Sequence, residues 1–233
     1  MKALLKLIQL EIRKNKLMGM LKGVVITNLA ILAFMILITY LDTTENGGEF
    51  KSYADMFAVG YTFIKAAFII FASVVLSKLV IDEYKNNTIT LLFMYPISRK
   101  KLMTAKIIIV FLFTTVNVFV SAILLNVVMV GINSFTHVIP DSLDLSMIPS
   151  ELTRISADAV YAAGISLIPL FFGMRKKSVP ATIVTAVLIV SLLSSGSSDF
   201  QLGNQVWVSL ALALVGVGIA YLSIRSIEQK DIA

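Results

Sequence analysis

Residues 107–132 read IIIVFLFTTVNVFVSAILLNVVMVGI, a run of 26 residues without a charged side chain. A helix needs about 20 mainly apolar residues to cross the hydrocarbon core of a bilayer, and this run exceeds that length. The whole chain has a similar character, because 58% of its 233 residues are hydrophobic and only 15% are charged. Soluble domains contain roughly 45–50% apolar and about 25% charged residues. The apolar excess therefore predicts an all-α, polytopic membrane protein.

Five further segments are apolar enough to span a bilayer, which brings the predicted number of transmembrane helices to six. Including the first run, the predicted spans are residues 23–41, 57–81, 107–132, 152–172, 179–195 and 206–224. The connecting segments are short and rich in polar or turn-forming residues. We therefore expect a cytoplasmic amphipathic helix over residues 1–22, a single transmembrane domain over 23–224 with a cytoplasmic loop at 82–106, and a cytoplasmic tail over 225–233.

The distribution of basic residues predicts the orientation. Seventeen of the 20 Lys and Arg residues lie in the N-terminal segment, the second loop with its flank, the fourth loop or the C-terminal segment. Short cytoplasmic loops retain Lys and Arg, and an even number of spans places both termini on one side. We therefore expect a multi-pass membrane protein with both termini in the cytoplasm. The net charge of +6 is then a topology signal and not a nucleic-acid-binding surface.

The first 16 residues have the periodicity of a helix and lack the uninterrupted apolar run of a signal peptide. The apolar positions that share one helical face are Leu4, Leu5, Ile8 and Ile12. The basic side chains lie largely off that face. This pattern predicts a helix lying in the membrane interface, with a helix surrounded by solvent as the alternative.

The sequence offers little material for catalysis. It has no cysteine and a single histidine, His137, so a thiolate metal site is excluded and a His-based zinc site or catalytic triad is disfavoured. It has no G-x-x-x-x-G-K-[ST] motif to hold nucleotide phosphates, and no H-E-x-x-H motif. We therefore expect no catalytic residue, no metal ligand and no bound cofactor in this chain.

The loop over residues 82–106 reads DEYKNNTITLLFMYPISRKKLMTAK. Thr88 can cap a short amphipathic helix over residues 89–94, which Pro96 ends. Ser98 can cap a second, basic helix that leads back into the membrane. A surface helix with an apolar face too short for a bilayer is suited to docking against another protein. A solvated hairpin is the alternative.

This loop resembles the cytoplasmic loop of ABC-2 type transporter permeases, the six-helix membrane subunits of bacterial ABC exporters. The resemblance rests on the acidic pair Asp82-Glu83, the Leu91-Leu92 helix, the Pro-Ile-Ser-Arg sequence at 96–99 and the lysine that opens the next span. The six spans, the amphipathic N-terminal helix and the cytoplasmic C-terminal segment, which includes Glu228 to Ile232, are similar too. Family members often have Gly-Thr where this chain has Asn87-Thr88, a mild departure because asparagine also tolerates positive φ.

The resemblance implies a type V exporter-like permease in which Glu83 to Met94 form a coupling helix against a separate ATPase dimer. The residues that would carry the coupling are Glu83, Thr88, Ile89, Leu92, Phe93, Pro96 and Arg99. The resemblance also implies that ATP and Mg²⁺ are bound by the ATPase. A second permease, identical or homologous, would pair with this one in the lipid membrane. Family members export peptides, drugs, polysaccharides or lipids, and the resemblance does not select one of these; for this chain we expect an amphipathic or antimicrobial peptide or a drug.

Two charged residues lie inside predicted spans. Lys65 is eight residues into the second span, where an ammonium group costs about 2.5–3.5 kcal/mol to insert. It can extend toward the interface, pair with Asp158 near the outer end of the fourth span, or line a path for cargo. Asn117 and Asn126 in the third span lie about 180° apart, so we expect each to bond a neighbouring helix rather than to line one path.

Other classes of membrane protein remain as alternatives. A secondary transporter or channel without an ATPase would show two similar three-helix halves with matching broken helices, and the sequence shows no such repeat. A membrane-embedded enzyme is disfavoured by the missing catalytic residues. A binding-only immunity or sensor protein is a further alternative, and an adjacent gene for a P-loop ATPase would discriminate against it.

Overall fold

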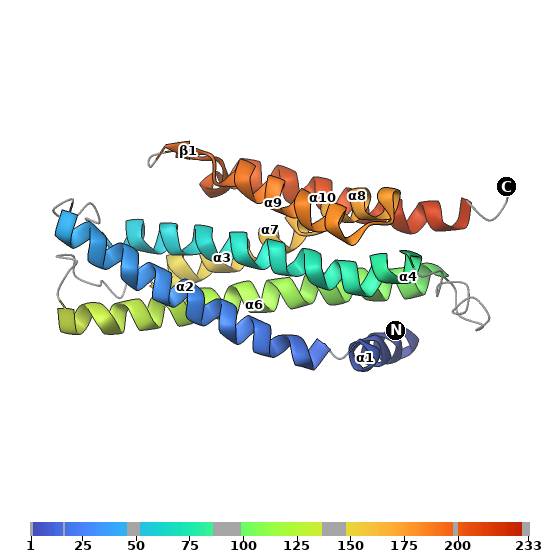
Figure 1. Ribbon diagram of the computed structural model, residues 1–233, viewed down its shortest axis with the longest axis horizontal. Coiled ribbons are helices and arrows are strands. Elements are labelled where there is room, and N and C mark those ends of the chain that lie inside the picture. The colour runs from blue at the N-terminus through green and yellow to red at the C-terminus, as the bar shows by residue number, and fades with distance from the viewer. Residues whose placement is uncertain are drawn as a thin grey trace.

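The computed structural model describes residues 2–15, 17–45, 52–85, 99–136, 148–197 and 200–229. Most of these residues are helical, and the long helices run along one axis (Figure 1). The α-helices are α1 (Lys2–Lys14), α2 (Leu17–Glu45), α3 (Tyr53–Leu76), α4 (Asp82–Lys85), α6 (Arg99–Thr136), α7 (Ile148–Ile165), α8 (Pro169–Lys176), α9 (Val179–Leu193) and α10 (Val206–Gln229). A π-helix, η1 (Ser77–Ile81), joins α3 to α4. The all-α prediction is thus confirmed.

Five helical stretches are long and apolar enough to cross a membrane. They are residues Gly19–Leu41, Tyr53–Lys85, Lys100–Phe135, Ile148–Lys176 and Val206–Arg225. The remaining predicted span corresponds to α9, a 15-residue apolar helix. At 1.5 Å per residue α9 is about 22 Å long, which is shorter than a hydrocarbon core of about 30 Å. The structure therefore has five candidate spans and one shorter apolar helix within the residues it describes.

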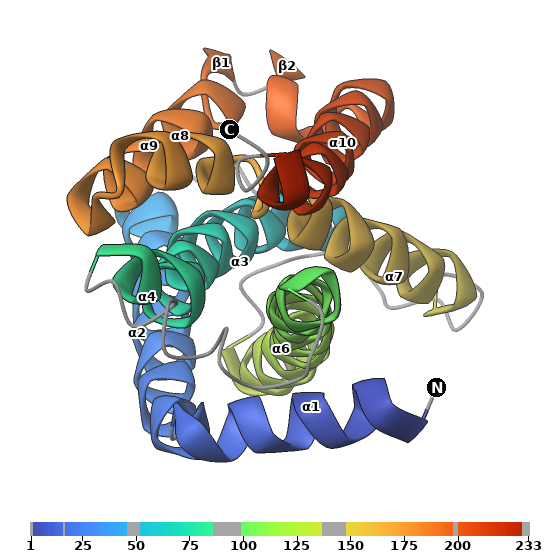
Figure 2. The ribbon, with the colours of Figure 1, turned by 90° about the vertical axis from the view of Figure 1, so that its right-hand side faces the viewer.

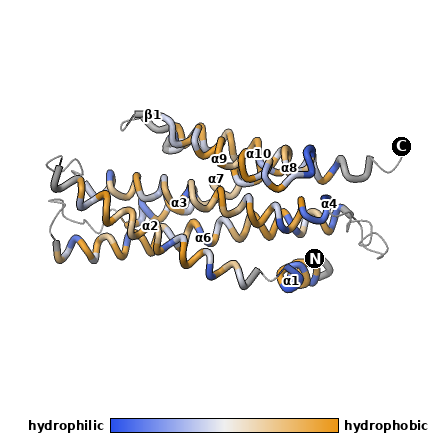
Figure 3. The backbone as a smooth tube through the Cα atoms, in the orientation of Figure 1, coloured by the Kyte–Doolittle hydropathy of each residue, from blue (hydrophilic) through white to orange (hydrophobic). Residues whose placement is uncertain are grey.

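The two ends of the molecule differ in polarity. Both termini, α1 and α4 lie at one end of the long axis, which we call the inner end (Figure 1). Hydrophilic residues gather there around α1, α4 and the end of α8, whereas the middle of the long helices is hydrophobic (Figure 3). The opposite, outer end carries the short hairpin of β1 (Gly196–Ser197) and β2 (Phe200–Gln201). This arrangement is the one expected when the chain crosses the apolar layer an even number of times.

Helix α3 lies at the centre of the bundle, with α2, α6, α7, α9 and α10 around it (Figure 2). Its side chains Ile64, Phe68 and Ile69 are almost completely buried. In contrast, only 17% of the most apolar window of α2 is buried, compared with 61% for the span that contains α3. A helix that is apolar on all sides but packed on one must face lipid or another subunit. Helix α2 therefore lies at the periphery of the bundle, where much of its surface is not covered by other helices of this chain.

The fourth span is broken between α7 and α8. Helix α7 ends at Ile165 and α8 starts with Pro169, whose ring fits the first turn of a helix and lacks the N–H that an unbroken helix would use. Just before the break, Gly164 lies against α10, where an added Cβ would come within 2.7 Å of the Ala213 Cβ. The absence of a side chain thus allows α7 and α10 to approach closely.

Helix α1 lies across the inner end, transverse to the long helices (Figure 2). Ile8 and Ile12 pack against the buried apolar cluster that includes Leu79 and Met103. Leu5, which the sequence placed on the same face, is 59% exposed, so part of the apolar face is left for the surroundings. The side chain of Leu4 lies outside the described residues. The predicted amphipathic helix is present, but it ends at Lys14, and the helix of the first span starts at Leu17.

Candidate functional site

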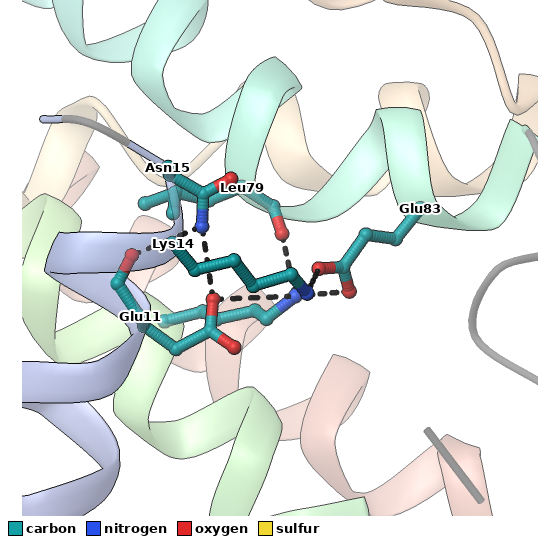
Figure 4. Close-up of polar contacts among 6 residues, drawn as sticks. Glu11, Lys14, Asn15, Leu79 and Glu83 are labelled. Carbon is teal, nitrogen blue, oxygen red and sulfur yellow. Dashed lines mark hydrogen bonds and ion pairs between the residues drawn. The ribbon is translucent and has the colours of Figure 1, made fainter. Parts of the chain in front are cut away.

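Six residues at the inner end form a polar cluster that we call the inner cluster. They are Glu11, Lys14, Asn15, Leu79, Glu83 and Lys106. Glu11, Lys14 and Asn15 come from α1 and the residue that follows it, Leu79 and Glu83 from η1 and α4, and Lys106 from α6. Figure 4 shows the side chains from these elements converging on one point. The cluster therefore joins three parts of the chain that are far apart in sequence.

Lys106 is the centre of the inner cluster and is only 2% exposed. Its ammonium group donates a hydrogen bond to the backbone carbonyl of Leu79 at 2.7 Å. It also binds the carboxylate of Glu83 and lies 3.9 Å from an oxygen of Glu11. An ammonium group buried without partners would be strongly destabilising. These oxygens explain how Lys106 is accommodated inside the bundle.

Glu83 is shared between two lysines. Its side chain lies on α4 and is 10% exposed. One carboxylate oxygen accepts from Lys106, and the other accepts from Lys14 of α1 at 2.7 Å (Figure 4). Glu11, also on α1, accepts from the amide of Asn15 at 3.1 Å. Two carboxylates and two ammonium groups therefore balance one another, so the cluster carries no net charge into the bundle.

Leu79 belongs to the π-helix η1, in which the backbone N–H of Asp82 donates to the carbonyl of Ser77. A π-helix has a widened turn, and such turns are rare and frequent at functional sites. Here the side chain of Lys106 binds the carbonyl in the middle of that turn. The same ammonium group thus holds both the irregular end of the second span and Glu83 a few residues later.

The structure places only part of the predicted coupling segment. Thr88, Ile89, Leu92, Phe93 and Pro96 lie outside the described residues, and so does the side chain of Arg99. Helix α4 ends at Lys85, directly before this part of the chain. Helix α6 begins at Arg99, next to the serine predicted to cap it. Glu83, the one predicted coupling residue with a described side chain, is engaged within the chain rather than exposed as a free charge.

The predicted intramembrane pair is brought together. Lys65 on α3 and Asp158 on α7 lie with nitrogen and oxygen 3.5 Å apart, at 12% and 18% side-chain exposure. Lys65 also donates to the backbone carbonyl of Gly203 at 2.9 Å. Gly203 belongs to η3 (Leu202–Asn204), a 3₁₀ turn after the outer hairpin. Lys65 thus connects the central helix to α7 and to the outer connection between α9 and α10.

Asn117 and Asn126, two asparagines of α6, have different hydrogen-bond partners. Asn126 donates to the hydroxyl of Tyr61 on α3 at 2.6 Å, as expected for a bond between helices. Asn117 donates instead to the carbonyl of Phe113 on its own helix, at 2.6 Å, so that prediction was wrong. A side-chain bond to the carbonyl four residues earlier is a local alternative that needs no partner helix.

Sequence reasoning missed Glu11, Lys14 and Lys106 as site residues. Lys14 was counted only toward the orientation, and Glu11 served only as an interruption of the apolar run near the N-terminus. Lys106 was counted toward the orientation and, as the lysine that opens the third span, toward the family resemblance. One signal was present, because Glu11 and Asn15 lie one helical turn apart, close to the face that carries Ile8 and Ile12. A carboxylate that is buried beside an apolar face needs a cation close to it. The position of Glu11 in the sequence therefore already indicated a buried cation nearby.

Comparison with known proteins assigns the chain to a family. Residues 7–194 match the family model described as ABC-2 family transporter protein. The chain is 42% identical over 227 residues to the uncharacterized protein YcbO of Bacillus subtilis (strain 168), with 97% of this chain and 100% of the relative covered. No solved structure matches the chain at a significant level. A bundle of apolar helices with a polar inner end agrees with a membrane transport component, and the chain belongs to the ABC-2 family of transporter proteins.

Proposed function

We propose that the chain is the permease subunit of an ATP-driven exporter in a bacterial cell membrane, with both termini in the cytoplasm. It works with a separate ATPase dimer that binds ATP and Mg²⁺, and with a second permease, identical or homologous. The cargo is an amphipathic peptide or a drug. The family supports a transport role, and the basic residues Arg175 and Lys176 at the inner end support a cytoplasmic location for that end.

The observation that carries the proposal is the position of Glu83. It lies on the last helical turn before residues 86–98, and it is bound to Lys106 of α6 and Lys14 of α1. A displacement of the coupling segment would therefore be passed to the second span, the third span and α1 together. The Lys106–Glu83 pair is buried, and it acts as a rigid link because separating it would leave an uncompensated charge inside the bundle.

In this mechanism, ATP-driven closure of the ATPase dimer pushes on the coupling segment, residues 83–94. The inner cluster transmits the push to α3 and α6, which tilt relative to the second permease. Rigid-body movement of helices about an interface is an established kind of switching transition. The path for cargo then opens between the two permeases.

The second permease is proposed to contact α2 and α9. Helix α2 exposes Val25, Ile26 and Leu29, and α9 exposes Val184 and Leu188. Membrane helices associate through close packing rather than through apolar character alone, and the small, exposed Ser191 of α9 is suited to that. The exposed side chains of α2 and α9 are not covered by the other helices of this chain.

The proposal is tested by co-purification with the ATPase. Docking would cover Ile89, Leu92 and Phe93, each worth roughly 1.5–3 kcal/mol if fully buried. Leu92→Asp should therefore abolish co-purification of the P-loop ATPase that the tagged parental chain retains, while the melting temperature stays unchanged. Ser142→Asp, in a predicted extracytoplasmic loop, is the matched control and should retain the ATPase. Full retention by Leu92→Asp would contradict the proposed coupling segment.

A further inference from the structure

A cavity of about 430 Å³ lies between α3, α6 and α7 toward the outer end. Its walls are mainly apolar and include Tyr53, Phe57, Val130, Leu152 and Ile155. The residues that line it belong neither to the inner cluster nor to the Lys65–Asp158 pair. Ligand sites in proteins are of this size, largely apolar and equipped with a few polar groups that fix orientation. The cavity therefore has the dimensions of a small-molecule site.

Two polar side chains, Asn126 and Glu151, line the cavity, and Tyr61 connects them. The Tyr61 hydroxyl donates its single proton to Glu151 at 3.0 Å, so it must accept the bond from the Asn126 amide nitrogen at 2.6 Å. This orientation turns the other amide atom, Oδ1, away from Tyr61. Among the described residues, Asn126 Oδ1 is a buried atom without a hydrogen-bond partner, so it does not open on the cavity, and the acceptor that the cavity offers is the carboxylate of Glu151.

The charged groups near the cavity also favour a donor. Arg154, one turn from Glu151 on α7, forms an ion pair with its carboxylate at 3.8 Å, a distance at which the guanidinium does not occupy a hydrogen-bond position on that carboxylate. The guanidinium group of Arg154 lies instead over the Tyr61 ring, 5.6 Å from its centroid, and its side chain is 38% exposed. Asp55 lies nearby in sequence at the start of α3, and it binds Ser52. Glu151 thus retains acceptor capacity toward the cavity.

We infer that this cavity binds an amphiphilic primary amine. The apolar part of the ligand occupies the space between α3, α6 and α7, and its ammonium group donates to Glu151. An ammonium group is suited to this carboxylate because it carries hydrogen-bond donors and a positive charge. Hydrogen bonds between a cation and a carboxylate are the stronger ones. The site takes a free amphiphile from the outer side, and it does not depend on the coupling segment.

The experiment uses dansylcadaverine, a fluorescent aromatic compound with a pentyl primary amine. The full-length chain is held in nanodiscs of phosphatidylcholine and phosphatidylglycerol, and empty nanodiscs give the background. We expect saturable binding of dansylcadaverine and binding about tenfold weaker for its N-acetyl derivative, which lacks the ammonium group. Equal affinity for the two compounds would show that the apolar body alone determines binding and would overturn the inference.

Single substitutions test the contribution of the lining residues to dansylcadaverine binding. Glu151→Gln keeps an acceptor for Tyr61 but removes the charge, so it should weaken dansylcadaverine binding about tenfold. Ala54→Trp adds bulk at an exposed lining position and should abolish binding. Asp55→Asn is the control, because this exposed carboxylate of the same region does not line the cavity. Unchanged affinity in Glu151→Gln and Ala54→Trp would contradict the site.

A lipid amine is tested in a separate arm. Phosphatidylethanolamine carries a primary ammonium in its headgroup, and its addition to the nanodiscs should leave the affinity for dansylcadaverine unchanged. Loss of binding in these nanodiscs would show that a lipid headgroup fills the cavity and would overturn the assignment to a free amphiphile. Because binding is measured without ATP or an ATPase, its failure is distinguishable from failure of the proposed export function.

Discussion

Lys65 on α3 and Asp158 on α7 lie 3.5 Å apart within the apolar part of the bundle. Lys65→Met would leave the carboxylate of Asp158 without this cation, and loss of one member of a buried pair costs about 3–5 kcal/mol. We expect a large drop in melting temperature in detergent. The double variant Lys65→Met with Asp158→Leu should recover much of it, although Gly203 then keeps only the bond from Ser209. Strict additivity of the two single effects would contradict the pairing.

The inner cluster gives a second prediction. Lys106→Met leaves the buried carboxylates of Glu83 and Glu11 without their central cation, so we expect a loss of about 3–5 kcal/mol in the free energy of unfolding. Lys101→Met on the same helix is the control, because Lys101 is exposed and such surface changes cost within about 0.5 kcal/mol. Thermal melting of the two purified variants makes the comparison. Equal melting temperatures would show that the cluster contributes nothing to stability.

The contact between α7 and α10 gives a third prediction. In Gly164→Ala, the added Cβ would come within 2.7 Å of the Ala213 Cβ and 2.9 Å of the Ala213 Cα, and overpacking of this kind costs about 1–3 kcal/mol. Gly131→Ala on α6 meets no atom within 4 Å, so it should be neutral or stabilising. The melting temperature of Gly164→Ala should therefore be lower than that of Gly131→Ala. A parental melting temperature for Gly164→Ala would refute the close packing.

Labelling of introduced cysteines tests the orientation. The native chain has no cysteine, so each introduced thiol is the only one present. Single cysteines at Gly48, Ser142 and Ser198 should react with an impermeant thiol reagent on intact cells, because the basic residues avoid these loops. Cysteines at Asn86 and Lys176 should react only after the cells are opened. The reverse pattern would contradict cytoplasmic termini.

The helical type of the apolar segments was predictable because apolar length determines whether a segment can span a bilayer. The predicted number of six spans was not confirmed, because the described residues contain five helical stretches of sufficient length and the 15-residue α9. The helix boundaries were less predictable. Helix α2 begins at Leu17, before the expected Gly23, because apolar residues continue the helix on the other side of Lys22. The Lys65–Asp158 pair was one of the expected alternatives, because a cation at that depth needs a partner. The bond from Lys65 to Gly203 depends on a connection 138 residues away in sequence, and no local pattern indicates it.

The inner cluster was not predictable as a unit. Each of its lysines is equally well explained as an orientation signal, because a count of basic residues does not distinguish exposed from buried positions. Burial of Lys106 depends on how α1 lies across α6, a tertiary relationship without a signature in either helix. Glu83, by contrast, was identified through the family resemblance, and the structure adds which residues it binds.

The most direct test of the account is whether the coupling segment touches the ATPase. A photoreactive amino acid placed at Leu92 should, on illumination of membranes that contain both subunits, give an adduct with the ATPase that mass spectrometry identifies. The same amino acid at Ser142, in a predicted outer loop, should give no such adduct. The account predicts an ATPase adduct from position 92 alone. Efficient crosslinking of position 92 to lipid only, in membranes where the ATPase is present, would contradict it.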